Sequence, residues 1–120
     1  MPRLSSKTTK PVRKASRKPA APDASYEEWL AESLRDPDEA AAYLDAVFAE
    51  GDQAAIMLAI RQVAKARGGV SAIAGKAKLT REATYRMLSQ TGNPELRSLS
   101  AILGASGLRL TVRAIEKKAA

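Results

Sequence analysis

Apolar and polar side chains follow helical periodicity from residue 25 onward. Ser25 and Glu28 have the spacing of a capping box, which is typical of a helix start. Large apolar residues then recur near the helical period, at Tyr26, Trp29, Leu30 and Leu34. This pattern predicts a first helix over about 26–34.

Two longer helices are predicted next, each with start and stop signals. Asp36 can cap the second helix with Pro37 at its first position, and Gly51 ends it. Asp52 can cap a third helix, which the glycine pair 68–69 stops. The apolar stripe of the second helix is Ala40, Tyr43, Leu44, Val47 and Phe48, and the third helix is apolar almost all round. We therefore expect the third helix to lie at the centre of the core.

Shorter elements follow the glycine pair. A helix over about 70–77, a short connection and a helix opened by Thr80 and running to Ser89 together form a candidate helix-turn-helix. Asn93 and Pro94 predict the start of a further helix, because both residue types favour the beginning of a helix. Its apolar face, which would brace the preceding pair, is Leu96, Leu99, Ile102 and Leu103.

The C-terminal stretch has a different period. Leu108, Leu110 and Val112 alternate with polar residues over 108–113, which is the spacing of a strand. A single strand needs a neighbouring strand to pair with. The same segment of a second subunit could be that neighbour. The alternative is an extended tail that packs one face on the core. The sequence thus predicts an all-α domain of five to six helices over 23–120, with a short C-terminal β-strand.

Composition narrows the chemistry. The chain has 120 residues, room for one domain, and it contains neither Cys nor His. Disulfides, thiolate or imidazole metal sites and a histidine general base are therefore excluded. No apolar run is long enough for a membrane span, since the longest covers 54–60. We expect a cytoplasmic protein that needs no cofactor and has no enzymatic activity.

Charge divides the chain into three blocks. Residues 1–22 carry +7, residues 23–60 carry −9 and residues 61–120 carry +9. The first block contains four prolines and few large apolar side chains, which predicts a disordered basic arm. An organelle transit peptide is the less favoured alternative, because the prolines would interrupt an amphipathic helix. The acidic and basic blocks of the domain suggest two different partners, with nucleic acid the natural one for the basic block.

Residues 70–89 resemble the helix-turn-helix of phage-repressor-like (XRE-type) DNA-binding domains. Ile73, Ala74, Leu79 and Met87 occupy the buried positions of that motif. Two positions depart from it: Lys78 stands where the turn usually has Gly for a positive φ, and Thr84 stands where a larger aliphatic residue is usually buried.

The resemblance extends over roughly 26–113. Six runs, in this order, are similar to those of the addiction-module antidote family, the HigA-type antitoxins. They are Asp-Pro-Asp-Glu-Ala-Ala-Ala-Tyr-Leu (36–44), Glu-Gly-Asp (50–52), Ala-Lys-Ala-Arg-Gly-Gly (64–69), Leu-Thr-Arg-Glu-Ala-Thr-Tyr-Arg (79–86), Gly-Asn-Pro (92–94) and Gly-Leu-Arg-Leu (107–110). Membership would imply a lambda-repressor-like fold and autorepression of a toxin-antitoxin operon. It would also imply neutralisation of a small basic RNase toxin of the HigB/RelE type.

The candidate DNA contacts follow from the helix-turn-helix. A recognition helix directs its first turns into the major groove, where Arg can read guanine and Glu can accept from cytosine. The residues expected to face DNA are Ser71, Thr80, Arg81, Glu82, Tyr85, Arg86 and Asn93. Ser71 and Asn93 could bind phosphate, but helix capping alone explains both residues and is the preferred interpretation.

Two further expectations concern partners. Operator-binding proteins of this kind commonly act as two-fold dimers, so we expect a homodimer with Leu108–Val112 as its first candidate interface. The acidic block from Asp23 to Asp52 is expected to face the basic toxin. The alternatives are a stand-alone transcriptional regulator without a toxin, or a helical interaction adaptor, which the departures at Lys78 and Thr84 would favour.

Overall fold

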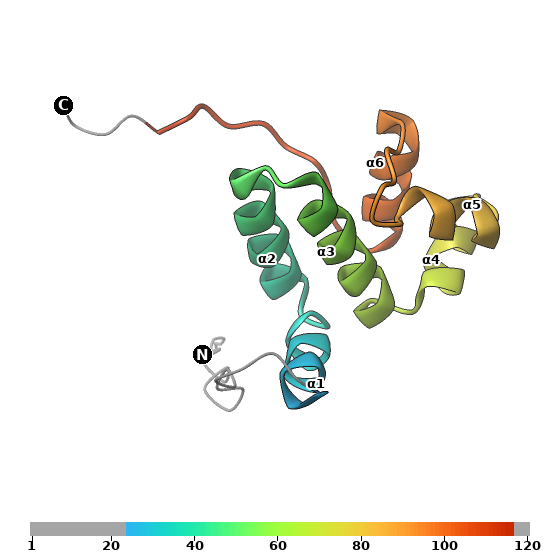
Figure 1. Ribbon diagram of the computed structural model, residues 1–120, viewed down its shortest axis with the longest axis horizontal. Helices are drawn as coiled ribbons and strands as arrows, with labels where there is room; N and C mark the ends of the chain where they lie inside the picture. Colours follow the sequence, from blue (N-terminus) through green and yellow to red (C-terminus); the bar gives the residue numbers. More distant parts are fainter. Residues whose placement is uncertain (1–23, 117–120) are drawn as a thin grey trace, which may run out of the picture.

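The computed structural model describes residues 24–116, and these residues form six helices and no strand (Figure 1). The helices are α1 (Ala24–Ser33), α2 (Pro37–Glu50), α3 (Gln53–Ala66), α4 (Val70–Lys76), α5 (Arg81–Met87) and α6 (Leu96–Ala105). The expected all-α fold is thus confirmed for this part of the chain. The basic arm predicted over 1–22 lies outside the described residues.

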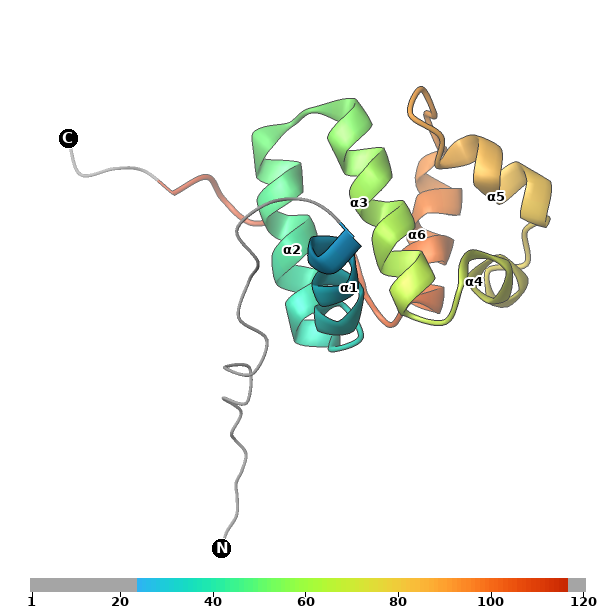
Figure 2. The same cartoon turned by 60° about the horizontal axis from the view of Figure 1, so that its bottom comes forward.

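Helix α3 lies at the centre of the fold. It packs against α1 and α2 on one side and against α4 on the other, while α6 contacts α4 (Figures 1 and 2). Five residues of α3 are buried, namely Met57, Ala59, Ile60, Val63 and Ala64. They join one apolar core that also includes Leu34 of α1, Leu44 of α2 and Ile102 of α6. The central position predicted for this helix is therefore confirmed.

Local capping explains the two longest helices. The Asp36 side chain accepts a hydrogen bond from the N–H of Asp38 at 2.8 Å, with Pro37 in the first turn. Gly51 ends α2 in the left-handed conformation, at φ +78°. The Asp52 side chain accepts from the N–H of Ala55 at 3.0 Å and starts α3. Both caps could be predicted from the sequence. A short acceptor side chain satisfies free N–H groups of the first turn, and the apolar stripe that follows marks the helix.

Both end helices form close to their predicted ranges, but two of the predicted start signals are wrong. Helix α1 begins at Ala24, so Ser25 lies inside the helix and does not cap it. Helix α6 begins at Leu96 with Glu95 as its N-cap residue, so Asn93 and Pro94 belong to the preceding loop. In the second case the loop is set by tertiary contacts described below, which local residue preference does not report.

The predicted C-terminal strand does not form within the described residues. Residues 108–116 leave α6 as a segment without regular secondary structure and run past α2 (Figure 1). Leu108 is half-buried and packs against the core, in keeping with the alternative of an extended tail. A period of two in the side chains does not make a strand in a single chain, because a strand needs a neighbouring backbone to bond.

Candidate nucleic-acid interface

Helices α4 and α5 form a pair joined by a tight turn. Ile73 and Ala74 of α4 are buried at 0% and 1% exposure, as predicted. The small side chain of Ala74 lets α5 cross close to α4. Leu79 and Met87 are only half-buried, and the fully buried residue at the end of α5 is Leu88, which the sequence pattern did not single out.

Both departures from the repressor motif are accommodated. Lys78 adopts φ +62° and is the one non-glycine residue with positive φ in the described range 24–116. Thr84 is fully buried, and its hydroxyl donates to the Thr80 carbonyl at 2.9 Å. The turn therefore has the backbone conformation that Gly usually supplies, and the buried hydroxyl is satisfied. The features that would favour an adaptor with a degenerate motif do not distort the pair.

Helix α5 presents its charged face to solvent. The Thr80 side chain caps it by accepting from the N–H of Ala83 at 3.0 Å. Because Thr84 and Leu88 point inward, the opposite face is exposed, and the exposed residues are Arg81, Glu82, Tyr85 and Arg86. The structure thus brings together five of the seven candidate DNA contacts, counting Thr80 at the helix start.

Arg81 and Tyr85 contact each other on that face. The Arg81 guanidinium lies over the Tyr85 ring, 5.6 Å from its centroid, one helical turn apart. Such a cation–π contact is worth about 0.5–1 kcal/mol at an exposed site. It restricts the Arg81 side chain without using its N–H donors, so these stay available for a ligand.

The other two candidates are placed differently from the prediction. Ser71 is exposed inside the first turn of α4, where Gly69 is the N-cap residue and no side chain caps the helix. Asn93 is exposed in the loop before α6 and caps nothing. Capping, the preferred explanation for both residues, is therefore wrong. Both side chains remain exposed beside the α4–α5 pair.

Helix α3 holds the loop between α5 and α6. The Gln53 side chain donates to the Gly92 carbonyl at 2.9 Å, and Arg61 donates to the Leu88 carbonyl at the end of α5. Gly92 is buried, and a Cβ atom there would lie 1.9 Å from the Met87 carbonyl oxygen. Sequence reasoning missed these positioning residues, because nothing in the local pattern ties α3 to a loop some 39 residues later.

Charge is distributed between the two sides of α3. On α1, α2 and the corner between them the exposed charged residues are almost all acidic. They are Glu27, Glu28, Glu32, Asp38, Asp45 and Glu50, and the exception is Arg35 in the corner. On α4, α5, α6 and the loops between them, the exposed basic residues are Lys76, Lys78, Arg81, Arg86 and Arg97. We call the first set the acidic face and the second the basic face. The two charge blocks of the sequence thus form largely separate surfaces of one domain, with Arg113, which pairs with Asp45 of α2, as an exception.

Arg67 joins the two sides at the end of α3. Its Nε donates to the Ser106 carbonyl at 2.9 Å, and its Nη1 donates to the Arg35 carbonyl at the α1–α2 corner. On the acidic side, the Tyr43 hydroxyl of α2 donates to Gln62 Oε1 of α3 at 2.6 Å. Burial, with a smaller contribution from Tyr26, raises the pKa of Tyr43. These contacts make α3 the common support of both faces.

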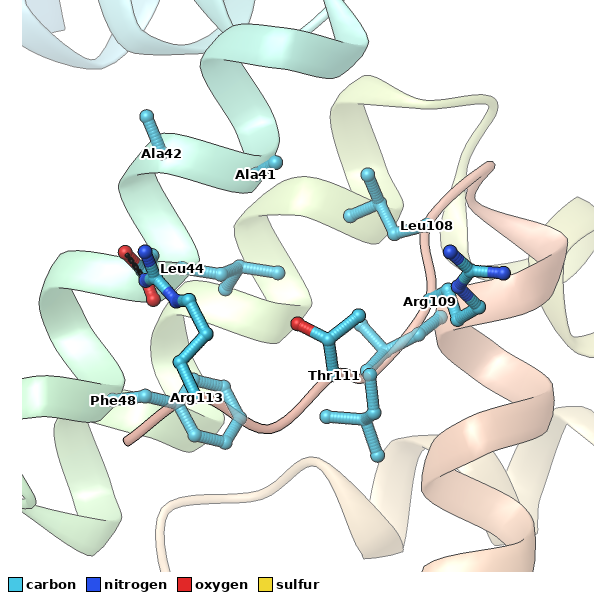
Figure 3. Close-up of a pocket in the computed structure, with 11 residues that line it drawn as sticks. Ala41, Ala42, Leu44, Phe48, Leu108, Arg109, Thr111 and Arg113 are labelled. Atoms are coloured by element: carbon cyan, nitrogen blue, oxygen red, sulfur yellow. Dashed lines mark hydrogen bonds and ion pairs between the residues drawn. The ribbon is translucent and has the colours of Figure 1, made fainter. Parts of the chain in front are cut away.

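The remaining surface features are modest. A cavity of about 460 Å³ lies between α2 and the C-terminal segment, with Leu44, Phe48 and Leu108 among its walls (Figure 3). Within residues 24–116 no group of three or more acidic side chains is placed to hold a metal ion. No helix of this part of the chain is long and apolar enough to cross a membrane.

The fold and the site define a small all-helical protein whose candidate site is a charged helix pair rather than an enclosed pocket. A family model described as that of a probable addiction module antidote protein matches residues 26–114. The chain therefore belongs to this family of antidotes, which confirms the addiction-module antidote family inferred from the sequence, though not its HigA type, and implies a toxin partner in general.

A relative from Haemophilus influenzae has a sequence similar to this chain. It is described as an uncharacterized protein and is 33% identical over 84 residues, which cover 70% of this chain and 86% of the relative. No solved structure matches the chain significantly. The assignment of this chain to the antidote family therefore rests on the family model.

Proposed function

We propose that this chain is the antitoxin of a type II toxin-antitoxin module and represses its own operon through the α4–α5 helix-turn-helix. In this proposal it acts by binding and not by catalysis, and it binds DNA as a homodimer. The observation that carries the DNA-binding part is the orientation of α5, which buries Thr84 and Leu88 and exposes Arg81, Glu82, Tyr85 and Arg86.

The exposed face suits the major groove. The Arg81 guanidinium can fork to the O6 and N7 atoms of guanine, Glu82 can accept from a cytosine amino group, and Tyr85 can contact a thymine methyl. Arg86, Thr80, Ser71 and Asn93 can bind phosphates, which set the orientation of the protein on the duplex. The remaining Lys and Arg residues of the basic face would add a sequence-independent attraction to DNA.

The toxin part of the proposal uses the acidic face. A small RNase toxin of the HigB/RelE type must grip RNA and therefore carries basic side chains. The acidic face complements such a surface and lies on the opposite side of α3 from α5. One domain could then hold toxin and operator at the same time.

Mobility shifts with the DNA upstream of the gene test the repressor part. Arg81→Ala should weaken operator binding by about 1–3 kcal/mol and relax the preference at one base pair. Lys65→Ala, which removes an exposed positive charge from α3, is the matched control and should change affinity little. Equal losses on operator and scrambled DNA would show that Arg81 is not a base reader.

A further inference from the structure

The C-terminal segment, residues 108–116, exposes an unusual amount of apolar surface. Of the six large apolar side chains that are exposed among the described residues, three belong to it: Leu110 at 37%, Val112 at 97% and Ile115 at 90% exposure. The segment makes up less than a tenth of the described chain. Exposed apolar side chains gathered in one short stretch mark an interaction site.

Its backbone is also unpaired. The Leu108 N–H donates to the Leu103 carbonyl at 2.8 Å, which closes the end of α6. Beyond Leu108, no backbone hydrogen bond joins residues 109–116 to another part of the described chain. An extended backbone with free N–H and C=O groups is a template for pairing with another strand.

The segment is nevertheless held in place at two points. Leu108 packs against the core, and Arg113 Nη2 lies 2.7 Å from Asp45 Oδ2 on α2. Between these points the segment and α2 line an open cavity of about 460 Å³, which Figure 3 shows. Leu44 and Phe48 of α2 line it, together with Leu110, and it is open to apolar side chains from outside.

We propose that this segment pairs antiparallel with the same segment of a second copy, across a two-fold axis at Leu110. Pairing of one patch with its own copy gives a closed, isologous dimer. In that ribbon Leu110 faces the partner's Leu110, and the exposed Val112 faces the partner's Leu108, which removes apolar surface from solvent. The homodimer itself is part of the proposed function; the interface and its register are inferred independently of DNA or toxin binding.

Charge and apolar pairing select the register. With the axis at Thr111, Arg109 would face the partner's Arg113 twice, and like charges directly opposite destabilise a strand pair. With the axis at Val112, Leu110 would face Ala114, and Arg109 would face the apolar Ile115. With the axis at Leu110, Leu110 faces itself, Leu108 faces Val112, and Arg109 faces Thr111. Only this register pairs the large apolar side chains with one another and places no arginine opposite another arginine or an apolar side chain.

Cysteine cross-linking tests the register, because the chain has no cysteine of its own. A residue on the axis of an antiparallel pair lies opposite its copy at a Cα separation of about 4.5–5.5 Å, within disulfide reach. Leu110→Cys should therefore be recovered largely as a disulfide-linked dimer on a non-reducing gel after mild oxidation. Thr111→Cys alone, one position along, is the matched control and should stay mostly monomeric.

A second pair of variants does not alter the apolar face. Arg109→Cys and Thr111→Cys, both at exposed positions, should each cross-link poorly alone but form a mixed dimer when the two proteins are combined. Self-linking of Thr111→Cys instead of Leu110→Cys would overturn the register. Absence of any cross-link, or sedimentation of the unaltered chain as a monomer at tens of micromolar, would overturn the interface and leave the operator test unaffected.

Discussion

The two sides of α3 reach their structures by different means. On the acidic side, α2 has 14 residues, starts with a side-chain cap and ends at a left-handed glycine. On the basic side, α4 and α5 have seven residues each, and α4 has no side-chain cap. Helices of two turns are unstable by themselves, because the cost of the first turn is not recovered.

The difference shows where the support of the candidate DNA-binding pair comes from. Gln53 and Arg61 of α3 bond to the loop after α5, and the loop closes tightly around Gly92. On the acidic side α2 packs on α3 but is long and has a cap at each end, whereas the short helices of the basic side depend on α3 to hold the loop that follows them. Changes to the loop should therefore harm the basic side more than equally small changes elsewhere.

Gly92→Ala should give the largest effect. Its Cβ atom would overlap the Met87 carbonyl, which is backbone and cannot turn away. We expect a loss of about 3 kcal/mol in the free energy of unfolding, measured by urea titration. Gly104→Ala is the control, because no atom lies within 4 Å of the added carbon and the helical site should gain about 0.5–1 kcal/mol. Equal stability of both variants would contradict a tight loop.

Charge reversal of the acidic face should separate the two binding partners. The triple variant Glu27→Lys, Glu28→Lys, Glu32→Lys should slow toxin association about tenfold at low salt, because charge of this kind mainly accelerates encounter. Operator affinity should stay nearly unchanged, since α1 does not pack against α4 or α5 closely. The same three positions changed to Gln should give a smaller effect. An unaltered association rate at low salt would exclude this face from toxin binding.

Lys78→Gly should stabilise the basic side. The left-handed conformation costs a non-glycine residue about 1–2 kcal/mol, part of which is offset by the greater freedom of glycine in the unfolded chain. We expect the free energy of unfolding, measured by thermal unfolding, to rise by about 0.5–1 kcal/mol. Lys76→Gly removes the same charge from the end of α4 and should instead lose stability. A gain in both variants would point to charge rather than backbone conformation.

Tyr43→Phe should have the smallest effect, on the acidic side. It removes the part-buried hydrogen bond to Gln62 and should cost about 0.5 kcal/mol near neutral pH, the low end for a hydrogen bond. The pKa of Tyr43 is raised in the folded state, so its protonated side chain stabilises the folded protein. This stabilisation is complete below the unfolded pKa of about 10 and is lost as the pH rises above it. The difference between the two proteins should therefore narrow above that pH. Tyr85→Phe, at an exposed ring, should leave stability nearly unchanged.

Local signals in the sequence predicted much of this structure. The caps at Asp36 and Asp52, the stop at Gly51 and the apolar stripes gave the long helices, because each depends on residues within one or two turns. The exposed face of α5 was also predictable, since one buried position in a helix determines which positions face away. The separation of charge along the chain anticipated two surfaces.

Other features depended on the tertiary structure. The start of α6 at Leu96, the burial of Leu88 and the bonds from Gln53 and Arg61 join residues far apart in sequence, which no local pattern encodes. The alternation of apolar and polar residues over 108–113 has the period of a strand, but it does not show which backbone such a strand would pair with. A helix satisfies its backbone groups within its own segment, whereas a strand and a loop take theirs from elsewhere, so only the folded chain decides them.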